Sequence, residues 1–297
     1  MAIAGNTSMK GSIVEFRTRD GVLLDGFLAT PKKRAKRGVL FIHGLGGSFF
    51  RSRMIKDMAA EMPKRGIAFL SIEQRGSYGA ALFSRIQGGK RRRMLAGGGF
   101  EKFKDCIHDI EGGIRALSRE GVREIFIAGH STGCQKAAYY QSKKKDRKVK
   151  GIILIAPADD YNSARMEGKR FDMMYRYARR RYKKEPDAMM PYRMGYSIES
   201  PSRFMSRVDS HFIESRIFNY ELKRLREFNS IKVPILAVFG SREKYVPRAV
   251  EECLGILRDN SSTGKFIGMV IKGADHGFKG KGIVLAEAVA GWIESGK

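Results

Sequence analysis

The chain has 297 residues, of which 42% are hydrophobic, so it can bury the core of one large domain, and wholesale disorder is excluded. Lysine and arginine total 57 against 31 acidic residues, which gives a formal net charge of +26. The basic runs are scattered and lack a stacking aromatic motif, which argues against specific nucleic-acid recognition and favours nonspecific, salt-sensitive adhesion to polyanions.

The cysteine content and the lengths of the apolar runs limit the cellular environment that the sequence predicts. The three cysteines are few and widely spaced, which favours neither a disulfide framework nor a metal site, so we expect no metal and no cofactor. No apolar run reaches the length of a membrane span, and the first residues lack the pattern of a secretion signal. We therefore expect a cytoplasmic protein that acts on a small molecule, either as a monomer or as a dimer.

The hydrophobic pattern alternates between strands and helices along the chain. Residues 13–17 and 22–28 predict a hairpin. Short apolar runs predict six further strands, at residues 38–43, 67–72, 124–128, 149–156, 233–239 and 266–271. Helical spacing recurs in five segments, at residues 54–65, 103–117, 134–143, 247–257 and 283–293. This alternation predicts an α/β protein with a mostly parallel, eight-stranded sheet and helices on both faces.

Two segments interrupt this alternation. Residues 77–100 are rich in glycine and arginine, and we expect them to form a surface loop. Residues 161–230 lie between two predicted strands, and a connection of that length needs structure of its own. Its helical spacing and its methionine and aromatic residues predict a helical cap on a core domain made of residues 1–160 and 231–297.

A candidate nucleophile lies between a predicted strand and a predicted helix. Gly129-His130-Ser131-Thr132-Gly133 fits the pattern G-x-S-x-G, in which the glycines let the serine occupy a sharp turn. The following helix directs its dipole and free N–H groups at the place where negative charge develops. The pattern predicts that Ser131 is a catalytic nucleophile, and the alternative is a glycine-rich turn with an incidental serine.

A serine hydroxyl is a weak nucleophile and needs an adjacent base. His276 follows the last predicted strand, at the sheet edge where active sites of such folds form, and it satisfies the chain order serine, acid, histidine. We expect Glu243, after the strand at 233–239, to be the acid that orients this imidazole. Asp160 and Asp159, which end the preceding strand, remain alternative acids.

The tetrahedral intermediate of such a reaction needs two backbone N–H donors, an oxyanion hole. One is expected from Thr132, the residue after the nucleophile. The other is expected from the loop His43-Gly44-Leu45-Gly46, at Leu45. A phosphate-binding role for that loop is disfavoured because it lacks the lysine and the serine or threonine that end a P-loop.

These motifs together resemble a known superfamily. His43-Gly44, residues 129–133, Gly240 to Pro247 and Asp275-His276-Gly277 resemble the α/β-hydrolase superfamily over nearly the whole chain. Residues 129–135 followed by 156–160 are similar to the fungal siderophore (fusarinine) esterase-like group, and the broader likeness is to carboxylesterases and feruloyl esterases with a helical cap. The resemblance implies an α/β-hydrolase fold and ester hydrolysis. It has one departure, because that group has aspartate where this chain has Glu243.

A serine nucleophile argues against dehalogenase and epoxide hydrolase chemistry, for which relatives use aspartate, and leaves acyl transfer to water. We expect a carboxylesterase that forms an acyl-enzyme on Ser131. His43, His130, Met174 and Tyr175 are expected to line the substrate pocket, where methionine and aromatic side chains suit an apolar group. The alternatives are a serine peptidase or amidase, a siderophore-type ester hydrolase, and a polyanion-binding protein without enzymatic activity on a hydrolase scaffold.

Overall fold

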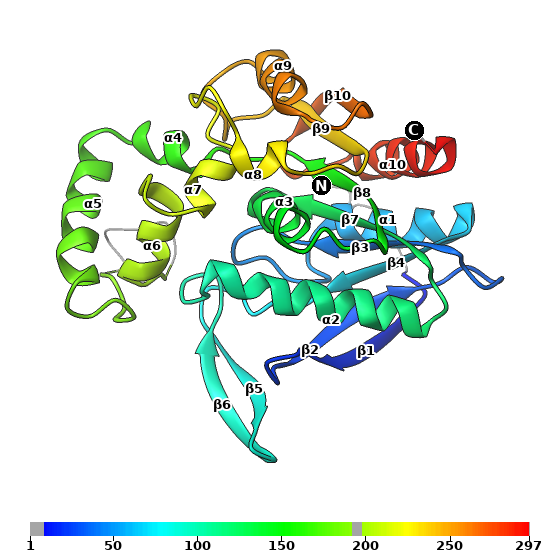
Figure 1. Cartoon of the computed structure of the whole chain (residues 1–297), viewed down its shortest axis with the longest axis horizontal. Helices are drawn as coiled ribbons and strands as arrows, with labels where there is room; N and C mark the ends of the chain where they lie inside the picture. The colour runs from blue at the N-terminus through cyan, green and yellow to red at the C-terminus, as the bar shows by residue number, and fades with distance from the viewer. Residues whose placement is uncertain (1–8, 192–197, 297) are drawn as a thin grey trace, which may run out of the picture.

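The computed structural model describes residues 9–191 and 198–296. Within these residues, eight strands form one sheet in the spatial order β1-β2-β4-β3-β7-β8-β9-β10 (Figure 1). β1 (Ser12–Arg17) pairs antiparallel with β2 (Leu23–Ala29), and β2 pairs antiparallel with β4, whereas the other neighbours are parallel. The predicted eight-stranded, mostly parallel sheet is therefore confirmed.

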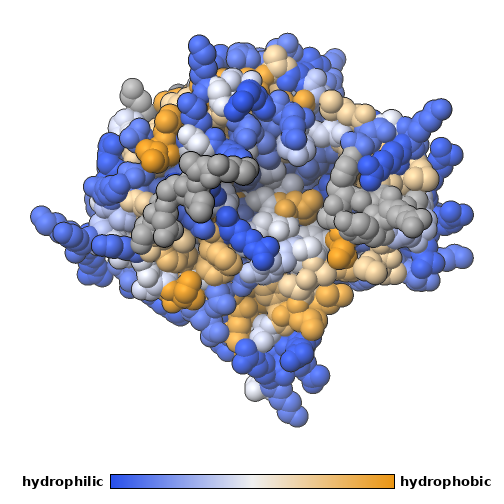
Figure 2. Space-filling model, turned by 180° about the vertical axis from the view of Figure 1, so that it is seen from behind, coloured by the Kyte–Doolittle hydropathy of each residue, from blue (hydrophilic) through white to orange (hydrophobic). Residues whose placement is uncertain are grey.

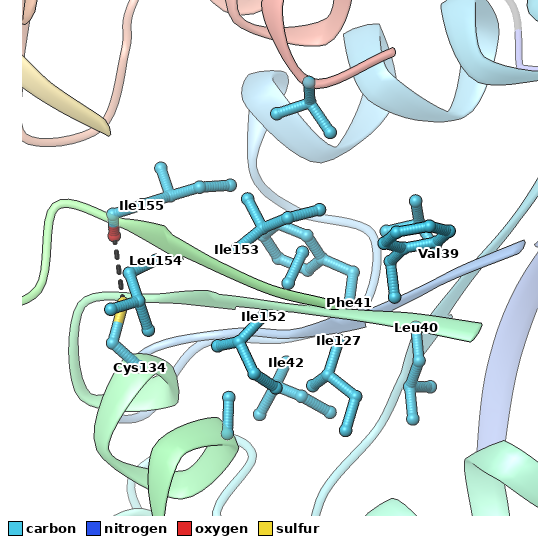
Figure 3. Packing of buried hydrophobic residues seen from close by; sticks show 14 of the residues in the cluster. Val39, Leu40, Phe41, Ile42, Ile127, Cys134, Ile152, Ile153, Leu154 and Ile155 are labelled. Carbon is cyan, nitrogen blue, oxygen red and sulfur yellow. Dashed lines mark hydrogen bonds between the residues drawn. The ribbon is translucent and has the colours of Figure 1, made fainter. Parts of the chain in front are cut away.

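The parallel strands, except β10 at the edge of the sheet, are its most deeply buried elements. Their bounds are β3 (Arg37–Ile42), β4 (Ile67–Ile72), β7 (Glu124–His130), β8 (Val149–Ile155), β9 (Ile235–Arg242) and β10 (Phe266–Asp275). Figure 3 shows side chains of β3, β7 and β8 packed together, among them Val39, Leu40, Ile127 and Ile153. Successive residues of these strands are apolar because both faces of a parallel sheet are covered by helices.

Helices cover the two faces of this sheet. α2 (Cys106–Arg119) and α3 (Thr132–Lys144) lie against one face, and α1 (Arg53–Glu61) packs with α10 (Gly282–Ser295) against the other (Figure 1). α9 (Val250–Asn260) packs against β9 and β10, and two short 3-10 turns, Met62–Arg65 and Phe103–Asp105, adjoin α1 and α2. Among the described residues, no helix combines the length and the apolar character needed to cross a bilayer.

The long connection between β8 and β9 is helical, and most of it lies to one side of the sheet (Figure 1). Its helices are α4 (Asp160–Arg165), α5 (Lys169–Tyr182), α6 (Pro201–Val208), α7 (Glu214–Ile217) and α8 (Arg226–Asn229). Apolar side chains of α5 and α6, such as Met174 and Phe204, form a second hydrophobic cluster, whereas Ile217 and Phe228 belong to the main core. The division into a core domain and a cap stays a prediction.

The surface loop expected at residues 77–100 was wrong, because this segment contains a second, two-stranded sheet. β5 (Ala81–Gln87) and β6 (Lys90–Ala96) pair antiparallel around a turn at Gly88 and Gly89. Both glycines have positive φ, 57° and 74°, as the favoured two-residue hairpin turns require. Four consecutive basic residues at the start of β6 obscured the alternation of apolar and polar residues that identifies a strand.

Candidate active site

The carboxyl ends of five neighbouring strands meet at one edge of the sheet. Register pairs Ile42 of β3 with Gly129 of β7, and His130 of β7 with Ile155 of β8, so the loops after these strands begin at one level. The loops after β9 and β10 reach the same edge, and residues from all five loops line a cavity of about 900 Å³. That volume is in the range of sites for small molecules.

Ser131 occupies a strained turn between β7 and α3. Its φ of 54° and ψ of −125° lie in a region of backbone conformation that residues other than glycine rarely adopt. A Cβ atom on Gly129 would lie 2.4 Å from the carbonyl oxygen of Gly133, and one on Gly133 would lie 2.1 Å from that of Ile42. Both glycines of the motif are therefore required by close backbone contacts, which the sequence pattern had indicated.

The end of β8 fixes the conformation of this turn. The backbone N–H of Ser131 donates to the carbonyl of Ile155 at 3.0 Å. The Cys134 thiol, in the first turn of α3, can donate to the same carbonyl at 3.3 Å (Figure 3) or to the Gly129 carbonyl at 3.1 Å. These hydrogen bonds connect the start of the helix to the sheet, so the Ser131 side chain is held at the cavity that it lines.

Glu243 and His276 form a hydrogen-bonded pair in the loops after β9 and β10. The His276 Nδ1 atom lies 2.9 Å from Oε1 and 2.8 Å from Oε2 of Glu243, whose side chain is fully buried. Burial raises the pKa of Glu243, but the hydrogen bonds from His276 and from the N–H groups of Tyr245 and Lys244 outweigh it and lower this pKa below its usual value. An ionised carboxylate only accepts, so Nδ1 donates to it and, in the neutral ring, Nε2 is left as a base.

Two aromatic rings fix the position of the His276 imidazole. The Tyr245 ring packs edge-on with its centroid 4.5 Å away, and the His130 ring lies at 5.0 Å. His130 also donates from Nε2 to the His276 carbonyl at 2.8 Å, and burial lowers the pKa of His130 to about 4, which keeps the ring neutral. Apart from its place after a late strand, no sequence pattern indicates that Tyr245 would contact His276.

Ser131 and His276 line the same cavity. Among the described residues, no hydrogen bond joins the Ser131 hydroxyl to the His276 ring, whose polar partner there is Glu243. Hydrogen bonds of this kind are often long in substrate-free enzymes and shorten when the substrate binds.

The loop after β3 passes directly over Ser131. A Cβ atom on Gly44 would lie 2.9 Å from Cβ and 3.4 Å from Oγ of Ser131. The Gly44 carbonyl accepts from the His43 ring at 2.8 Å and from the Gly47 N–H at 3.1 Å. In a trans peptide the N–H points opposite to the carbonyl, so the Leu45 N–H points away from these two donors.

Thr132, the other predicted oxyanion donor, lies at the start of α3. Thr132 is the first residue of α3, and the first N–H groups of a helix have no acceptor within it. Thr132 and Leu45 both line the cavity together with Ser131. The geometry is compatible with an oxyanion hole formed by these two N–H groups.

His43 lies behind the loop and stabilises it. Its Nε2 atom lies 2.8 Å from the Ser77 hydroxyl, which in turn accepts from the Gln74 N–H at 2.9 Å. Burial lowers the pKa of His43 to about 4, so the ring is neutral: Nδ1 donates to the Gly44 carbonyl, and Nε2 accepts from Ser77. Sequence reasoning did not identify this connection to Ser77, which comes from the loop after β4.

Asp159 and Asp160, the two alternative acids, lie in different environments from that of Glu243. Asp159 caps α4 by accepting from the Asn162 N–H at 2.9 Å and also accepts from the Tyr220 N–H at 3.0 Å. Asp160 lines the cavity, where its Oδ2 atom is buried and has no hydrogen-bond partner among the residues that the structure describes, and burial raises its pKa to about 6. The carboxylate that bonds to His276 is that of Glu243.

Three of the four expected pocket residues line the cavity: His43, His130 and Met174. Tyr175 is not part of the described lining, because its ring stacks on Phe171 and its hydroxyl donates to Asp209 at 2.6 Å. The cavity also exposes charged side chains that the sequence had not marked, namely Arg51, Glu167, Glu199, Arg207 and Lys244. Charged residues of helices and loops alike usually face solvent, so no sequence pattern distinguishes those that face a cavity.

One family model covers almost the whole chain. The model of the family described as "Protein of unknown function (DUF1749)" matches residues 7–293. The chain belongs to the DUF1749 family. No curated protein sequence matches it.

Solved structures share the fold of this DUF1749 member over nearly its full length. The siderophore hydrolase EstB from Aspergillus fumigatus has a TM-score of 0.72 at 17% identity and covers 98% of this chain and 99% of its own. Est1E from Butyrivibrio proteoclasticus, with ferulic acid bound, has a TM-score of 0.67 at 17% identity and covers 95% and 98%. A soluble variant of monoglyceride lipase from Saccharomyces cerevisiae, in complex with a substrate analog, has a TM-score of 0.69 at 15% identity and covers 100% and 99%. At these identities the likeness confirms the predicted α/β-hydrolase fold.

Proposed function

We propose that this chain is a serine hydrolase that cleaves carboxylic esters through an acyl-enzyme on Ser131. The observation that carries the proposal is the hydrogen-bonded Glu243–His276 pair, whose imidazole lines the same cavity as a serine on a strained strand-to-helix turn. No structural requirement of the sheet explains why a carboxylate, an imidazole and a strained serine should end three different strands at one cavity. Acyl transfer requires these groups together.

Each group has a defined task in this mechanism. The Ser131 hydroxyl attacks the ester carbonyl carbon while His276 Nε2 accepts its proton, and Glu243 stabilises the imidazolium that forms. The N–H groups of Leu45 and Thr132 donate to the oxyanion of the tetrahedral intermediate. The intermediate collapses, the alcohol leaves with the proton from His276, and the acyl group stays on Ser131. Water then attacks the acyl-enzyme, giving a proton to His276. The bond to Ser131 breaks, His276 returns that proton to the serine oxygen, and the carboxylic acid is released.

The lining of the cavity supports an ester with a sizeable apolar part. Apolar side chains from α1, α5 and α6, such as Ile55, Met174 and Phe204, contribute to its wall. Such a wall binds acyl or aryl groups by burial of apolar surface. Structural neighbours are named for a siderophore hydrolase, for bound ferulic acid and for a monoglyceride lipase, which supports the ester class.

The proposal is tested by hydrolysis of p-nitrophenyl esters, hydroxycinnamate esters and matched amides. We expect turnover of the esters by the wild type and a decrease in kcat of about 10⁴- to 10⁶-fold for Ser131→Ala. Ser163→Ala is the matched control, because Ser163 lines the same cavity and its buried hydroxyl has no hydrogen-bond partner among the described residues. Ester turnover that survives Ser131→Ala in a folded protein contradicts the proposal. Faster turnover of the amides than of the esters would redirect it to a peptidase or amidase.

A further inference from the structure

The hairpin of β5 and β6, residues 81–96, forms an arm that projects from the rest of the molecule (Figure 1). One face of the arm turns toward the protein, where Phe83 and Ala96 are buried. On the opposite face, Leu82 and Leu95 are directly paired across the two strands. Their exposed fractions are 62% and 52%, so two adjacent leucines form an apolar surface on a projecting element.

The same arm carries a concentration of positive charge. Residues 81–96 include five basic residues and no acidic one: Arg85, Lys90, Arg91, Arg92 and Arg93. Within the described part of the chain, none of these five forms an ion pair with a carboxylate, although Arg91 donates to the Ser84 hydroxyl and Arg85 to the Asp20 backbone carbonyl. Figure 2 shows a hydrophilic tip on this projection and hydrophobic residues closer to the body. Exposed leucines and uncompensated cations therefore occur side by side.

We propose that the arm docks the protein on an anionic lipid surface. Leucine side chains gain free energy by entering the boundary between headgroups and acyl chains, and arginine side chains bind the phosphates above it. Basic residues close to an anionic membrane add binding energy that salt weakens. The combination of an apolar pair and adjacent cations fits this surface in both respects.

Two other kinds of partner fit the arm less well. Proteins that bind single-stranded nucleic acid stack bases on exposed aromatic rings, and Phe83, the aromatic residue of the arm, is buried. A second copy of the chain would bring two sets of five unpaired cations together, on a protein that already carries a net charge of +26. A nucleic acid would therefore find no exposed ring on which to stack its bases, and a second copy would be repelled by like charge. An anionic lipid surface needs no ring and carries the opposite charge.

The base of the arm connects to the cavity. The Tyr78 N–H donates to the Gly47 carbonyl at 2.9 Å, and the Gly98 N–H donates to the Tyr78 carbonyl at 2.7 Å. Gly98 in turn accepts from Arg203 Nε of α6 at 3.0 Å. Docking through the arm would therefore orient the loop over Ser131 and α6 relative to the lipid surface, although the docking itself requires no catalysis.

The apolar contribution is tested by sedimentation with vesicles of phosphatidylcholine mixed with phosphatidylglycerol. Leu82→Ser with Leu95→Ser keeps the charge of the protein and should lower the partition coefficient about tenfold. Ile13→Ser with Ile283→Ser is the matched control, because these residues are 64% and 48% exposed at other sites. The control variant should bind like the wild type. The Leu82 and Leu95 effect should persist at high salt, where the general attraction of a basic protein is screened.

The basic contribution is tested with the same vesicles at low salt. Arg91→Gln with Arg93→Gln should weaken binding about tenfold, and more than Lys32→Gln with Lys33→Gln, which removes the same charge from an exposed loop. Vesicles of phosphatidylcholine alone should bind all variants weakly. Melting temperatures establish that each variant is folded.

Three results would overturn the proposal. The first is that the double leucine variant binds anionic vesicles like the wild type, because binding then follows net charge alone. The second is that the leucine variants change self-association, but not vesicle binding, in sedimentation velocity. The third is that the arginine variants lose binding to polyuridylate while vesicle binding is unchanged. Ser131→Ala should bind vesicles like the wild type, so failure of the catalytic proposal leaves this one intact.

Discussion

At the scale of single residues, the hydrogen bonds of Glu243 determine which nitrogen of His276 carries a proton. Oε1 of Glu243 accepts from the N–H groups of Lys244 and Tyr245, both at 2.8 Å. A carboxylate can accept from His276 Nδ1 at the same time, because both of its oxygens are acceptors. In the proposed mechanism Nε2 is then the atom that accepts the proton of Ser131, and the tautomer is fixed before substrate arrives.

Glu243→Gln reverses this arrangement. The Gln oxygen would accept from the two backbone N–H groups, and its amide nitrogen would then donate to Nδ1, which places the imidazole proton on Nε2. We expect kcat to decrease about 10³- to 10⁴-fold, with little change in melting temperature, because the shape of the residue is kept. Steady-state hydrolysis of a p-nitrophenyl ester measures the effect.

Glu243→Asp is the matched control for that change. It keeps the charge, and it places in this chain the residue that the resembling esterases have. We expect a smaller decrease in kcat, because the shorter side chain weakens the bond to His276 but leaves the tautomer unchanged. Wild-type kcat in Glu243→Gln would show that this carboxylate is not the catalytic acid and would return attention to Asp160.

At the scale of elements, the loop after β3 is the part whose backbone takes a direct part in the proposed chemistry. Leu45→Pro removes the N–H group together with the leucine side chain, which lines the cavity, and the preceding Gly44 tolerates a following proline. We expect kcat to decrease about 10²- to 10³-fold. Leu45→Ala keeps the N–H and should retain kcat within about threefold. Equal losses in the two variants would assign the effect to the Leu45 side chain and contradict an oxyanion role.

Periodicity in the sequence predicted most elements of the sheet and the helices on its two faces. Strands such as Arg37–Ile42 and Ile67–Ile72 are short apolar runs between polar turns, so local pattern and tertiary burial agree there. The arm was missed because Lys90–Ala96 begins with four basic residues and packs only part of one face on the protein. A strand that packs little of its surface against a hydrophobic core need not show a regular alternation of apolar and polar residues, so the sequence pattern does not reveal it.

The candidate site could be predicted to the extent that chain order determines it. Ser131, Glu243 and His276 each follow a strand, and parallel strands bring their carboxyl ends to one edge. The contacts of Tyr245 and Ser77 could not be predicted, because they depend on how separate loops pack against one another. Such contacts leave no periodic signal in the sequence.

At the scale of the whole molecule, the buried neutral histidine at 43 makes the fold sensitive to acid. Its pKa is about 4 in the folded chain against 6.5 for an ordinary histidine, because burial disfavours the charged ring. Between these two pH values the unfolded chain binds a proton that the folded chain does not, so stability decreases as pH falls from 6.5 to 4. The full effect of this one group is about 3 kcal/mol.

His43→Asn removes that titration while its amide can still donate to the Gly44 carbonyl. We expect the wild type to lose more stability than the variant, by about 2 to 3 kcal/mol, between pH 6.5 and pH 4 in urea unfolding. The comparison with the variant isolates His43 from Asp160, whose raised pKa of about 6 has the opposite effect. Equal acid losses in the two proteins would contradict a neutral, buried His43.

The most direct test of the central claim is covalent labelling of the wild-type protein with a fluorophosphonate, followed by mass mapping of the adduct. An activated serine should gain one phosphonyl group, and the modified peptide should place it on Ser131. His276→Ala should react far more slowly, since the hydroxyl then has no base. A folded wild type that stays unlabelled, or that carries the label on another residue, would contradict the account.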